Sequence, residues 1–417
     1  MAVKYPLARV SLSDKAVKAF EKVIKSGWVT QGPVTIQFEN AFKKYVDCRY
    51  ACAVSNCTSA LHMALLAVGV SPGDVVITVS HSFIASANAV RHCNAEPVFI
   101  DIYEGTLNMS ASRLECFLKT LCKYKNKAYY FKKADKLAAA PSPLAYCKPP
   151  LGRVAAIMPV HQLGNPCDIK SILKIAASYK IPVVEDAACA LGSEVSMDGG
   201  KSFKKIGCAQ SDIVCFSFHP RKIITTGDGG MLTTNKLSYD KKFRLLRQHA
   251  MSIPDYKRHQ SNDIFIESYI HTGYNYRLTD IQAAIGLTQL KEIDKLINER
   301  KKLARNYYHL LESIPIVNLP LTNCYGKPNW QSYYVSFNKK INQKKLMAFL
   351  LSKGIASKPG VTCIHREPAY SSNNSYACLE KSEYAQCNGI IIPLYSGLTY
   401  KDQVYIIDMV KRGLSIV

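Results

Sequence analysis

A lysine that follows a strand-like run is the residue best suited to covalent chemistry in this 417-residue chain. The apolar run 213–217 (IVCFS) indicates a buried strand, and an exposed polar segment with His219, Arg221 and Lys222 follows it. The glycines that begin at Gly227 then turn the chain into the next apolar run. Loops after the carboxyl ends of parallel strands form the ligand-binding edge of a sheet. A lone lysine is usually a solvated surface charge, so its role depends on its companions.

Asp186 is the first such companion, because it ends the preceding strand-like run, 182–186 (PVVED). A carboxylate beside a pyridine nitrogen keeps that nitrogen protonated, and a nearby lysine forms a Schiff base with an aldehyde. Pyridoxal phosphate (PLP) needs both groups. Phe83 could stack on its flat ring, although a phenylalanine at a strand end is also typical of a core. Asp186 could instead cap a helix over 187–191 (AACAL).

A phosphate site is indicated by residues 54–65 (VSNCTSALHMAL), which have the pattern of a strand, a polar turn and a helix start. Free amides around Thr58 and Ser59, together with the positive end of the helix dipole, attract an anion. Ser217 could add a hydroxyl to the same phosphate. The alternative is that Asn56 or Thr58 only caps the helix.

Seven short apolar runs must position these residues, and they lie at 50–54, 75–79, 97–101, 154–158, 182–186, 213–217 and 230–234. Helical stretches lie between the early runs, so the pattern predicts an α/β fold with a mostly parallel sheet covered on both faces. A first helix is predicted over 13–26, with Gly27 as its stop. Thr279 and Gln282 form a capping-box pattern that opens a long helix toward Glu312.

The chain is predicted to form two domains. Residues 1–250 make a large cofactor-binding domain with a loop-like insertion at about 119–150. Residues 251–417 make a long connecting helix and a smaller C-terminal α/β domain.

The charge distribution and the spacing of the cysteines limit the classes of function that the chain could have. Lys and Arg number 54 against 31 Asp and Glu, and the net charge of +23 is spread in short runs, which favours a solvated surface over nucleic-acid binding. The densest of the fifteen cysteines, Cys48, Cys52 and Cys57, have no histidine at ligand spacing, so no metal site is predicted. No apolar stretch reaches the roughly 18 to 20 residues of a membrane span, and a reducing cytoplasm is expected.

Several segments resemble the DegT/DnrJ-type nucleotide-sugar aminotransferases, a family of fold-type-I PLP enzymes in the aspartate aminotransferase superfamily. The similarity covers nearly the whole chain in the family's order, apart from the insertion. The matching segments are GWVTQGP (27–33), SNCTSALHMAL, SHSFIASANAV, MPVHQLGNPCDI (158–169), VEDAACALGS, FSFHPRKIITTGDGG, RQHAMS (247–252), GYNYRLTDIQAAIG (273–286), HREPAY (365–370) and IIIPLYSGLTYKDQ.

The resemblance implies a role for each candidate residue. Lys222 would bind the cofactor covalently, Asp186 would pair with the ring nitrogen and Phe83 would stack on the ring. The phosphate ligands would be Thr58, Ser59 and Ser217, with Asn275 supplied by the neighbouring subunit of a homodimer. Some relatives have His in place of the lysine and act as dehydrases, so Lys222 favours aminotransfer.

Two departures from the family pattern concern the same site. Cys189 stands where the family commonly has Gln near the phenolic oxygen of the cofactor, and a thiol is a weak donor. A histidine found in many relatives is replaced around 331–333. Candidate substrate contacts are His219, Arg221, Arg277 and Ser332, of which Arg221 and Arg277 could bind a diphosphate or be ordinary surface residues.

The implied reaction is amino transfer from L-glutamate to a keto-sugar attached to a nucleoside diphosphate. A 4-keto-6-deoxyhexose is the expected acceptor, and a surface polysaccharide is the expected destination of the amino sugar. One alternative is a 3-keto-sugar aminotransferase or another lysine-dependent PLP sugar enzyme. The other is a non-catalytic regulatory or nucleic-acid-binding protein on the same fold.

Overall fold

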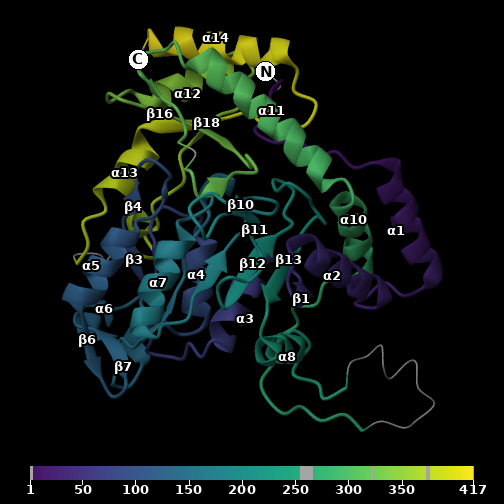
Figure 1. Cartoon of the computed structure of the whole chain (residues 1–417), viewed down its shortest axis with the longest axis vertical. Helices are drawn as coiled ribbons and strands as arrows, with labels where there is room; N and C mark the ends of the chain where they lie inside the picture. Colours follow the sequence, from purple (N-terminus) through teal and green to yellow (C-terminus); the bar gives the residue numbers. More distant parts are fainter. Residues whose placement is uncertain (1–2, 254–265, 322, 372–375, 417) are drawn as a thin grey trace.

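A seven-stranded sheet forms the centre of the larger part of the molecule (Figure 1). The computed structural model describes residues 3–253, 266–321, 323–371 and 376–416. All seven apolar runs predicted as strands are strands in it. They are β1 (Tyr50–Val54), β2 (Val75–Val79), β3 (Glu96–Ile100), β8 (Val154–Ile157), β9 (Val184–Asp186), β12 (Ile213–Ser217) and β13 (Gly230–Thr234).

The sheet consists of two hydrogen-bonded sets, β1-β13-β12-β9 and β3-β2-β8. Parallel bridges between Ile157 and Val183 and between Val160 and Asp186 join β8 to β9. Strand β13 is antiparallel to both of its neighbours, whereas the pairs β9–β12, β2–β8 and β2–β3 are parallel. The prediction of a mostly parallel sheet is therefore confirmed.

Both faces of the sheet are buried, because helices pack on each side. Val75 and Ile77 belong to one core and Val76 to the other, as the alternation of side chains along a strand requires. These two cores account for the near-continuous apolar runs in the sequence. The covering helices are α2 (Pro33–Val46), α3 (Cys57–Ala67), α4 (Ala85–His92), α5 (Ala111–Leu121), α7 (Ile169–Tyr179) and α8 (Leu237–Leu246).

The predicted ends of two helices are confirmed, but the long helix is wrong. Helix α1 (Asp14–Ser26) stops at Gly27, whose φ is 72°. The capping box at Thr279 opens α10 (Asp280–Leu290), and a separate helix, α11 (Ile293–Leu311), follows. No Gly or Pro breaks the chain there; packing decides, since α10 contacts α1 and α2 whereas α11 contacts the C-terminal helix α14 (Tyr400–Leu414).

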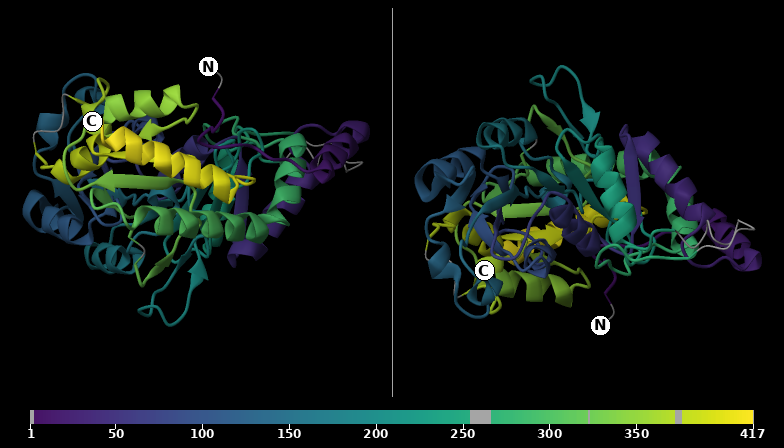
Figure 2. Two further views of the ribbon diagram at one scale, coloured as in Figure 1. Left: turned by 90° about the horizontal axis from the view of Figure 1, so that it is seen from above. Right: turned by 90° about the horizontal axis from the view of Figure 1, so that it is seen from below.

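The smaller part has its own sheet, of order β14-β16-β18-β17, and its own core. Figures 1 and 2 show α11 and α14 side by side over this sheet. Tyr5 belongs to this core as well, so the N-terminal segment reaches the smaller part. The division of the chain at residue 250 stays a prediction. The elements are β14 (Val317–Asn318), β16 (Tyr333–Phe337), α12 (Gln343–Ser352), β17 (Lys358–Pro359), α13 (Glu380–Cys387) and β18 (Gly389–Ile392).

The segment 119–150 is more regular than the predicted loop. Helix α5 enters it, and β6 (Cys122–Lys125) and β7 (Ala128–Phe131) then form a hairpin at the lower left of Figure 1. Asn126 and Lys127 both have positive φ, as a two-residue turn between twisted strands requires. Phe131 stacks on Phe117 with ring centroids 5.4 Å apart, which ties the hairpin to the core.

The remaining elements are short and connect the larger ones. They are β4 (Ile102–Tyr103), β5 (Asn108–Met109), α6 (Ala134–Leu137), β10 (Glu194–Val195), β11 (Lys204–Lys205) and β15 (Gly326–Lys327), with 3₁₀ turns at Pro143–Tyr146, Gln162–Gly164 and Ile364–Arg366. Within the described ranges, no helix is both long enough and apolar enough to span a bilayer.

Candidate active site

A cavity of about 280 Å³ lies at the carboxyl ends of β9 and β12. Strand β9 contributes Asp186 to its wall, and the loop after β12 contributes Lys222. The other predicted residues that line it are Thr58, Phe83, Cys189, Ser217, His219, Arg221 and Ser332. Ser59, Asn275 and Arg277 do not line it. The structure thus brings most of the predicted site together from segments that are far apart in the sequence.

The segment after β12 was predicted to be exposed, which holds for Arg221, but Lys222 itself sits on an anchored part of it. Its backbone N–H donates to the His219 carbonyl at 2.8 Å, which closes a turn directly after β12. The next four residues, 223–226, are buried, and the Thr225 hydroxyl donates to the Phe218 carbonyl at 2.8 Å. Lys222 is half-buried as a result, so its amine is held at the cavity wall.

The Lys222 amine lies beside Cys189, with 3.1 Å between Nζ and Sγ. Burial alone would lower the pKa of Lys222, but Cys189, Cys57 and the Asp186 carboxylate outweigh it, so the pKa is raised. A cationic partner for Asp186 would remove part of that effect and favour the neutral amine. The amine is the form that acts as a nucleophile or base.

Asp186 is held by two hydrogen bonds. Its Oδ2 accepts from the Ser86 hydroxyl at 2.8 Å, and its Oδ1 accepts from the Ala188 backbone N–H at 3.1 Å. No helix follows, because 188–189 form a turn, so the helix-cap alternative is wrong. Sequence reasoning missed Ser86, although it lies in the SHSFIASANAV segment that pointed to Phe83.

The N-terminus of α3 faces the cavity through Thr58 and the cap residue Asn56. Asn56 does cap the helix: its Oδ1 accepts from the Ser59 backbone N–H at 2.8 Å. The Ser59 amide is therefore already engaged, which corrects the expectation of a free donor there. The Ser59 hydroxyl lies 3.3 Å from the Ser55 hydroxyl and is buried. Thr58 is better placed for an anion.

Phe83 is 60% exposed and lines the cavity, so the alternative that it belongs to the core is wrong. Ser217 is buried at the end of β12, where its hydroxyl accepts from the His219 backbone N–H at 3.3 Å. Gln331 and Lys358 also line the cavity. Sequence reasoning named the segment around Gln331 but overlooked Lys358, which follows no long apolar run.

Asn275 and Arg277 lie outside the cavity of their own chain. Asn275 is exposed, and its side-chain oxygen accepts from the Arg277 guanidinium at 3.3 Å. Asn275 also forms a backbone bridge with Gln248. Both residues therefore present polar groups on the surface before α10 and do not reach Lys222.

The residues of the cavity fit PLP. The amine of Lys222 suits an aldehyde, the carboxylate of Asp186 suits a protonated ring nitrogen, and the exposed face of Phe83 suits a flat ring. The start of α3 with Thr58, and the hydroxyl of Ser217, suit a phosphate. These groups line one cavity, and Asp186 and Lys222 have opposite charges within it.

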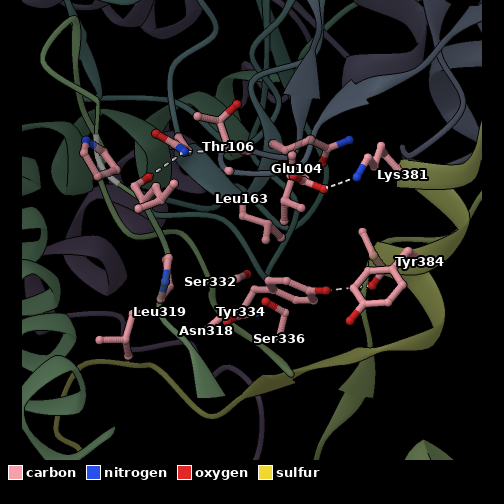
Figure 3. Close-up of a pocket in the computed structure, with 18 of the residues that line it drawn as sticks. Glu104, Thr106, Leu163, Asn318, Leu319, Ser332, Tyr334, Ser336, Lys381 and Tyr384 are labelled. Carbon is pink, nitrogen blue, oxygen red and sulfur yellow. Dashed lines mark hydrogen bonds and ion pairs between the residues drawn. The ribbon is translucent and has the colours of Figure 1, made fainter. Parts of the chain in front are cut away.

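A second, larger cavity of about 530 Å³ adjoins the first. Gln162, Leu163 and Ser332 line both, so they form the shared wall. Figure 3 shows Leu163 and Ser332 in the larger cavity, and the ion pair between Lys381 and Glu104 at its upper right.

Comparison with known proteins identifies the family. Residues 11–123 and 147–411 match the DegT/DnrJ/EryC1/StrS aminotransferase family. The stretch between the two matched segments, 124–146, lies within the predicted insertion. The spore coat polysaccharide biosynthesis protein SpsC of Bacillus subtilis is 30% identical over 97% of this chain and 96% of its own length.

Solved structures share the fold over almost the full length. DesV of S. venezuelae is 26% identical, with a TM-score of 0.81 and coverage of 99% of both chains. Spr1654 of Streptococcus pneumoniae, solved in a PLP form, is 22% identical, with a TM-score of 0.81 over 99% of this chain and 98% of its own. The fold-type-I prediction is confirmed.

The family match covers most of the chain, and the fold and the cavity agree with it. The alternative of a non-catalytic regulatory or nucleic-acid-binding protein on the same fold is therefore wrong. The chain belongs to the DegT/DnrJ/EryC1/StrS aminotransferase family and is a PLP-dependent sugar aminotransferase of amino-sugar or polysaccharide biosynthesis.

Proposed function

We propose that this enzyme acts in the cytoplasm and moves the amino group of L-glutamate onto a nucleoside-diphosphate-linked 4-keto-6-deoxyhexose. The product would be a 4-amino sugar for a surface polysaccharide. Support for the destination comes from the similarity to SpsC, whose name places it in spore coat polysaccharide biosynthesis. The observation that carries the reaction type is the Lys222 amine in one cavity with Asp186.

Bound PLP supplies an electron-withdrawing ring that makes the α-proton of an amino acid acidic. The chain must hold that ring and move the proton. Asp186 would hold a proton on the ring nitrogen, and its bonds from Ser86 and Ala188 fix the direction of its oxygens. Lys222 Nζ would take the α-proton and return it on the other side of the transferred nitrogen.

The acceptor is tested with a panel of nucleoside-diphosphate keto-sugars incubated with L-glutamate and the PLP-loaded enzyme. Mass spectrometry detects the gain of the amino group, and NMR identifies the aminated carbon. Amination at C4 of a 6-deoxy sugar supports the proposal. Amination at C3 favours the 3-keto-sugar alternative, and no amination of any keto-sugar contradicts both.

We also propose that two chains build each active site, so that the working unit is a homodimer. Asn275 is exposed and outside its own cavity, so it can donate to a phosphate only in another chain. A dianionic phosphate needs several donors, and the Ser59 amide is already taken by Asn56. A donor from the partner subunit would add to the phosphate contacts of Thr58 and Ser217.

Sharing is tested by co-expressing Lys222→Ala chains with Asn275→Asp chains under two affinity tags. Each variant alone has defective sites, but the heterodimer has one site with both wild-type residues. With random pairing, about a quarter of all sites in the mixture, and about half of those in the doubly tagged heterodimer, would have both wild-type residues. Restored activity in the doubly purified fraction supports sharing. No restoration, or a fully active monomer, contradicts it.

A further inference from the structure

Two cations line the cofactor cavity without an acidic partner. Arg221 and Lys358 both contribute to its wall, and neither forms an ion pair with any residue that the structure describes. Exposed cations need no partner, but Lys358 is half-buried, and its charge is partly removed from water. Neither cation is needed to hold the ring or to move the proton, so both remain available to a ligand.

Lys358 lies close to the reacting amine. It begins β17, which pairs with β18 at Ile391 and so fixes the backbone beneath it. Burial lowers the pKa of Lys358, and the positive charges of Arg221 and Lys222 lower it further. Three cationic side chains therefore act on one another within this cavity, and an anion placed among them would relieve their repulsion.

Arg221 is held in place through its main chain. Its backbone N–H donates to His219 Nδ1 at 3.3 Å, and its carbonyl accepts from the side-chain amide of Gln331. Gln331 Oε1 is buried and has no hydrogen-bond partner among the described residues. The two contacts with His219 and Gln331 fix the main chain of Arg221 at the cavity wall.

We propose that Arg221 and Lys358 form a subsite for the α-carboxylate of the amino donor. The inference rests on the proposed aminotransferase function and names how its first substrate is held. An α-carboxylate is attached to the very carbon that gives its proton to Lys222 Nζ, so its binding site must lie beside that nitrogen. The diphosphate of a sugar nucleotide is attached across the sugar ring from a C4 ketone and would lie farther away.

The geometry also gives the pair a function in catalysis. Guanidinium binds a carboxylate through two parallel N–H bonds, and ammonium adds a point charge. Two fixed contacts on one carboxylate restrict rotation of the donor about its reacting carbon. That restriction keeps the α-proton directed at Lys222, which is the positioning effect that speeds an intramolecular transfer.

The test is Lys358→Met, which keeps the length of the side chain and removes its charge. The PLP form of the enzyme is mixed with L-glutamate, and the loss of the PLP absorbance band is followed. We expect kcat/KM for this half-reaction to fall about 10- to 100-fold, mainly through KM, because the contact exists before the proton moves. Lys358→Arg should recover most of the loss.

Two controls separate a lost contact from a damaged fold. Lys353→Met makes the same chemical change on an exposed lysine just after α12 and should leave the half-reaction unchanged. The PLP absorbance spectrum of Lys358→Met should equal that of the wild type. Calorimetric binding of 2-oxoglutarate, which carries the same carboxylate, should weaken by a similar factor without any turnover.

The half-reaction with the sugar nucleotide distinguishes the two possible anions. It should change less than about threefold in Lys358→Met. An equal or larger fall there would assign the pair to the diphosphate and overturn the proposal, as would unchanged kinetics with L-glutamate and unchanged binding of 2-oxoglutarate. If the wild type reacts with another α-amino acid instead of L-glutamate, the proposed donor is wrong. The same measurements then test the subsite with that amino acid.

Discussion

The two adjoining cavities share a wall but differ in how their polar groups are satisfied. In the larger one, Lys381 pairs with Glu104, and the hydroxyls of Tyr334 and Tyr384 donate to backbone carbonyls at 2.7 and 2.8 Å (Figure 3). In the smaller one, Lys358 has no acidic partner among the described residues, and Lys222 contacts a thiol.

The groups suited to covalent chemistry therefore line the smaller of the two cavities. Buried polar groups are nearly always paired, so unpaired ones indicate a place kept ready for a ligand. In the larger cavity, the ion pair and the two tyrosine hydroxyls find their partners within the chain itself. The smaller cavity carries Arg221 and Lys358, which have no acidic partner among the described residues.

The largest effect is expected at Lys222. Lys222→Ala removes both the covalent attachment of the cofactor and the base, so transamination should fall by more than about 10⁴-fold. The fold should persist, because among the described residues the Lys222 amine makes a hydrogen bond only with Cys189. Half-reaction kinetics and circular dichroism measure the two quantities. Appreciable turnover in a folded Lys222→Ala enzyme would place the chemistry elsewhere.

The next effect is expected at Asp186. Asp186→Asn keeps the volume and an acceptor for the Ala188 N–H but removes the charge that stabilises a protonated ring nitrogen. Proton transfer should slow about 10²- to 10³-fold, with a smaller loss of cofactor affinity. Stopped-flow absorbance gives the rate, and a titration with PLP gives the affinity. Near-normal rates would reduce Asp186 to a turn-stabilising residue.

Substitutions of Cys189 test whether its contact with Lys222 contributes to catalysis. Cys189→Ser retains a small polar group beside Nζ, so activity should stay within about threefold of the wild type. Cys189→Gln should be tolerated if the cavity has room. Steady-state rates measure both variants, and complete loss in the serine variant would give the thiol a role of its own.

The smallest effect is expected in the larger cavity. Lys381→Met breaks an ion pair whose side chains are 50% and 63% exposed. Such a pair contributes at most about 1 kcal/mol to the free energy of unfolding, and the half-reaction with L-glutamate should not change. Urea denaturation and half-reaction kinetics check the two expectations. A tenfold slower half-reaction would show that the larger cavity takes part after all.

Much of the fold could be predicted because buried parallel strands have a distinct sequence pattern, a near-continuous run of apolar residues. Val75–Val79 is apolar at nearly every position, since both of its faces meet a core. Helix ends could be predicted where a residue has a local role, as Gly27 and Thr279 do. The break between Leu290 and Ile293 could not, because only distant packing determines it.

The candidate site likewise contains some residues that could be predicted from the sequence and others that could not. Asp186 and Lys222 follow strand ends, and strand ends converge in a parallel sheet, so their proximity could be anticipated. Lys358 begins a two-residue strand in the smaller part, and nothing local distinguishes it from other lysines. Ser86 could not be predicted for a similar reason. Its hydroxyl contacts Asp186 only because α4 packs beside that residue in the fold. The roles of Lys358 and Ser86 both depend on contacts between residues far apart in the sequence.

The most direct test of the site is to trap the cofactor on the chain. The PLP-loaded enzyme is treated with borohydride, digested, and mapped by mass spectrometry. We expect the pyridoxyl group on Lys222 alone, and its absence after prior reaction with L-glutamate, which converts the cofactor to its amine form. A pyridoxyl group on another lysine, or none in cofactor-saturated enzyme, would contradict the assignment of Lys222 as the reacting residue.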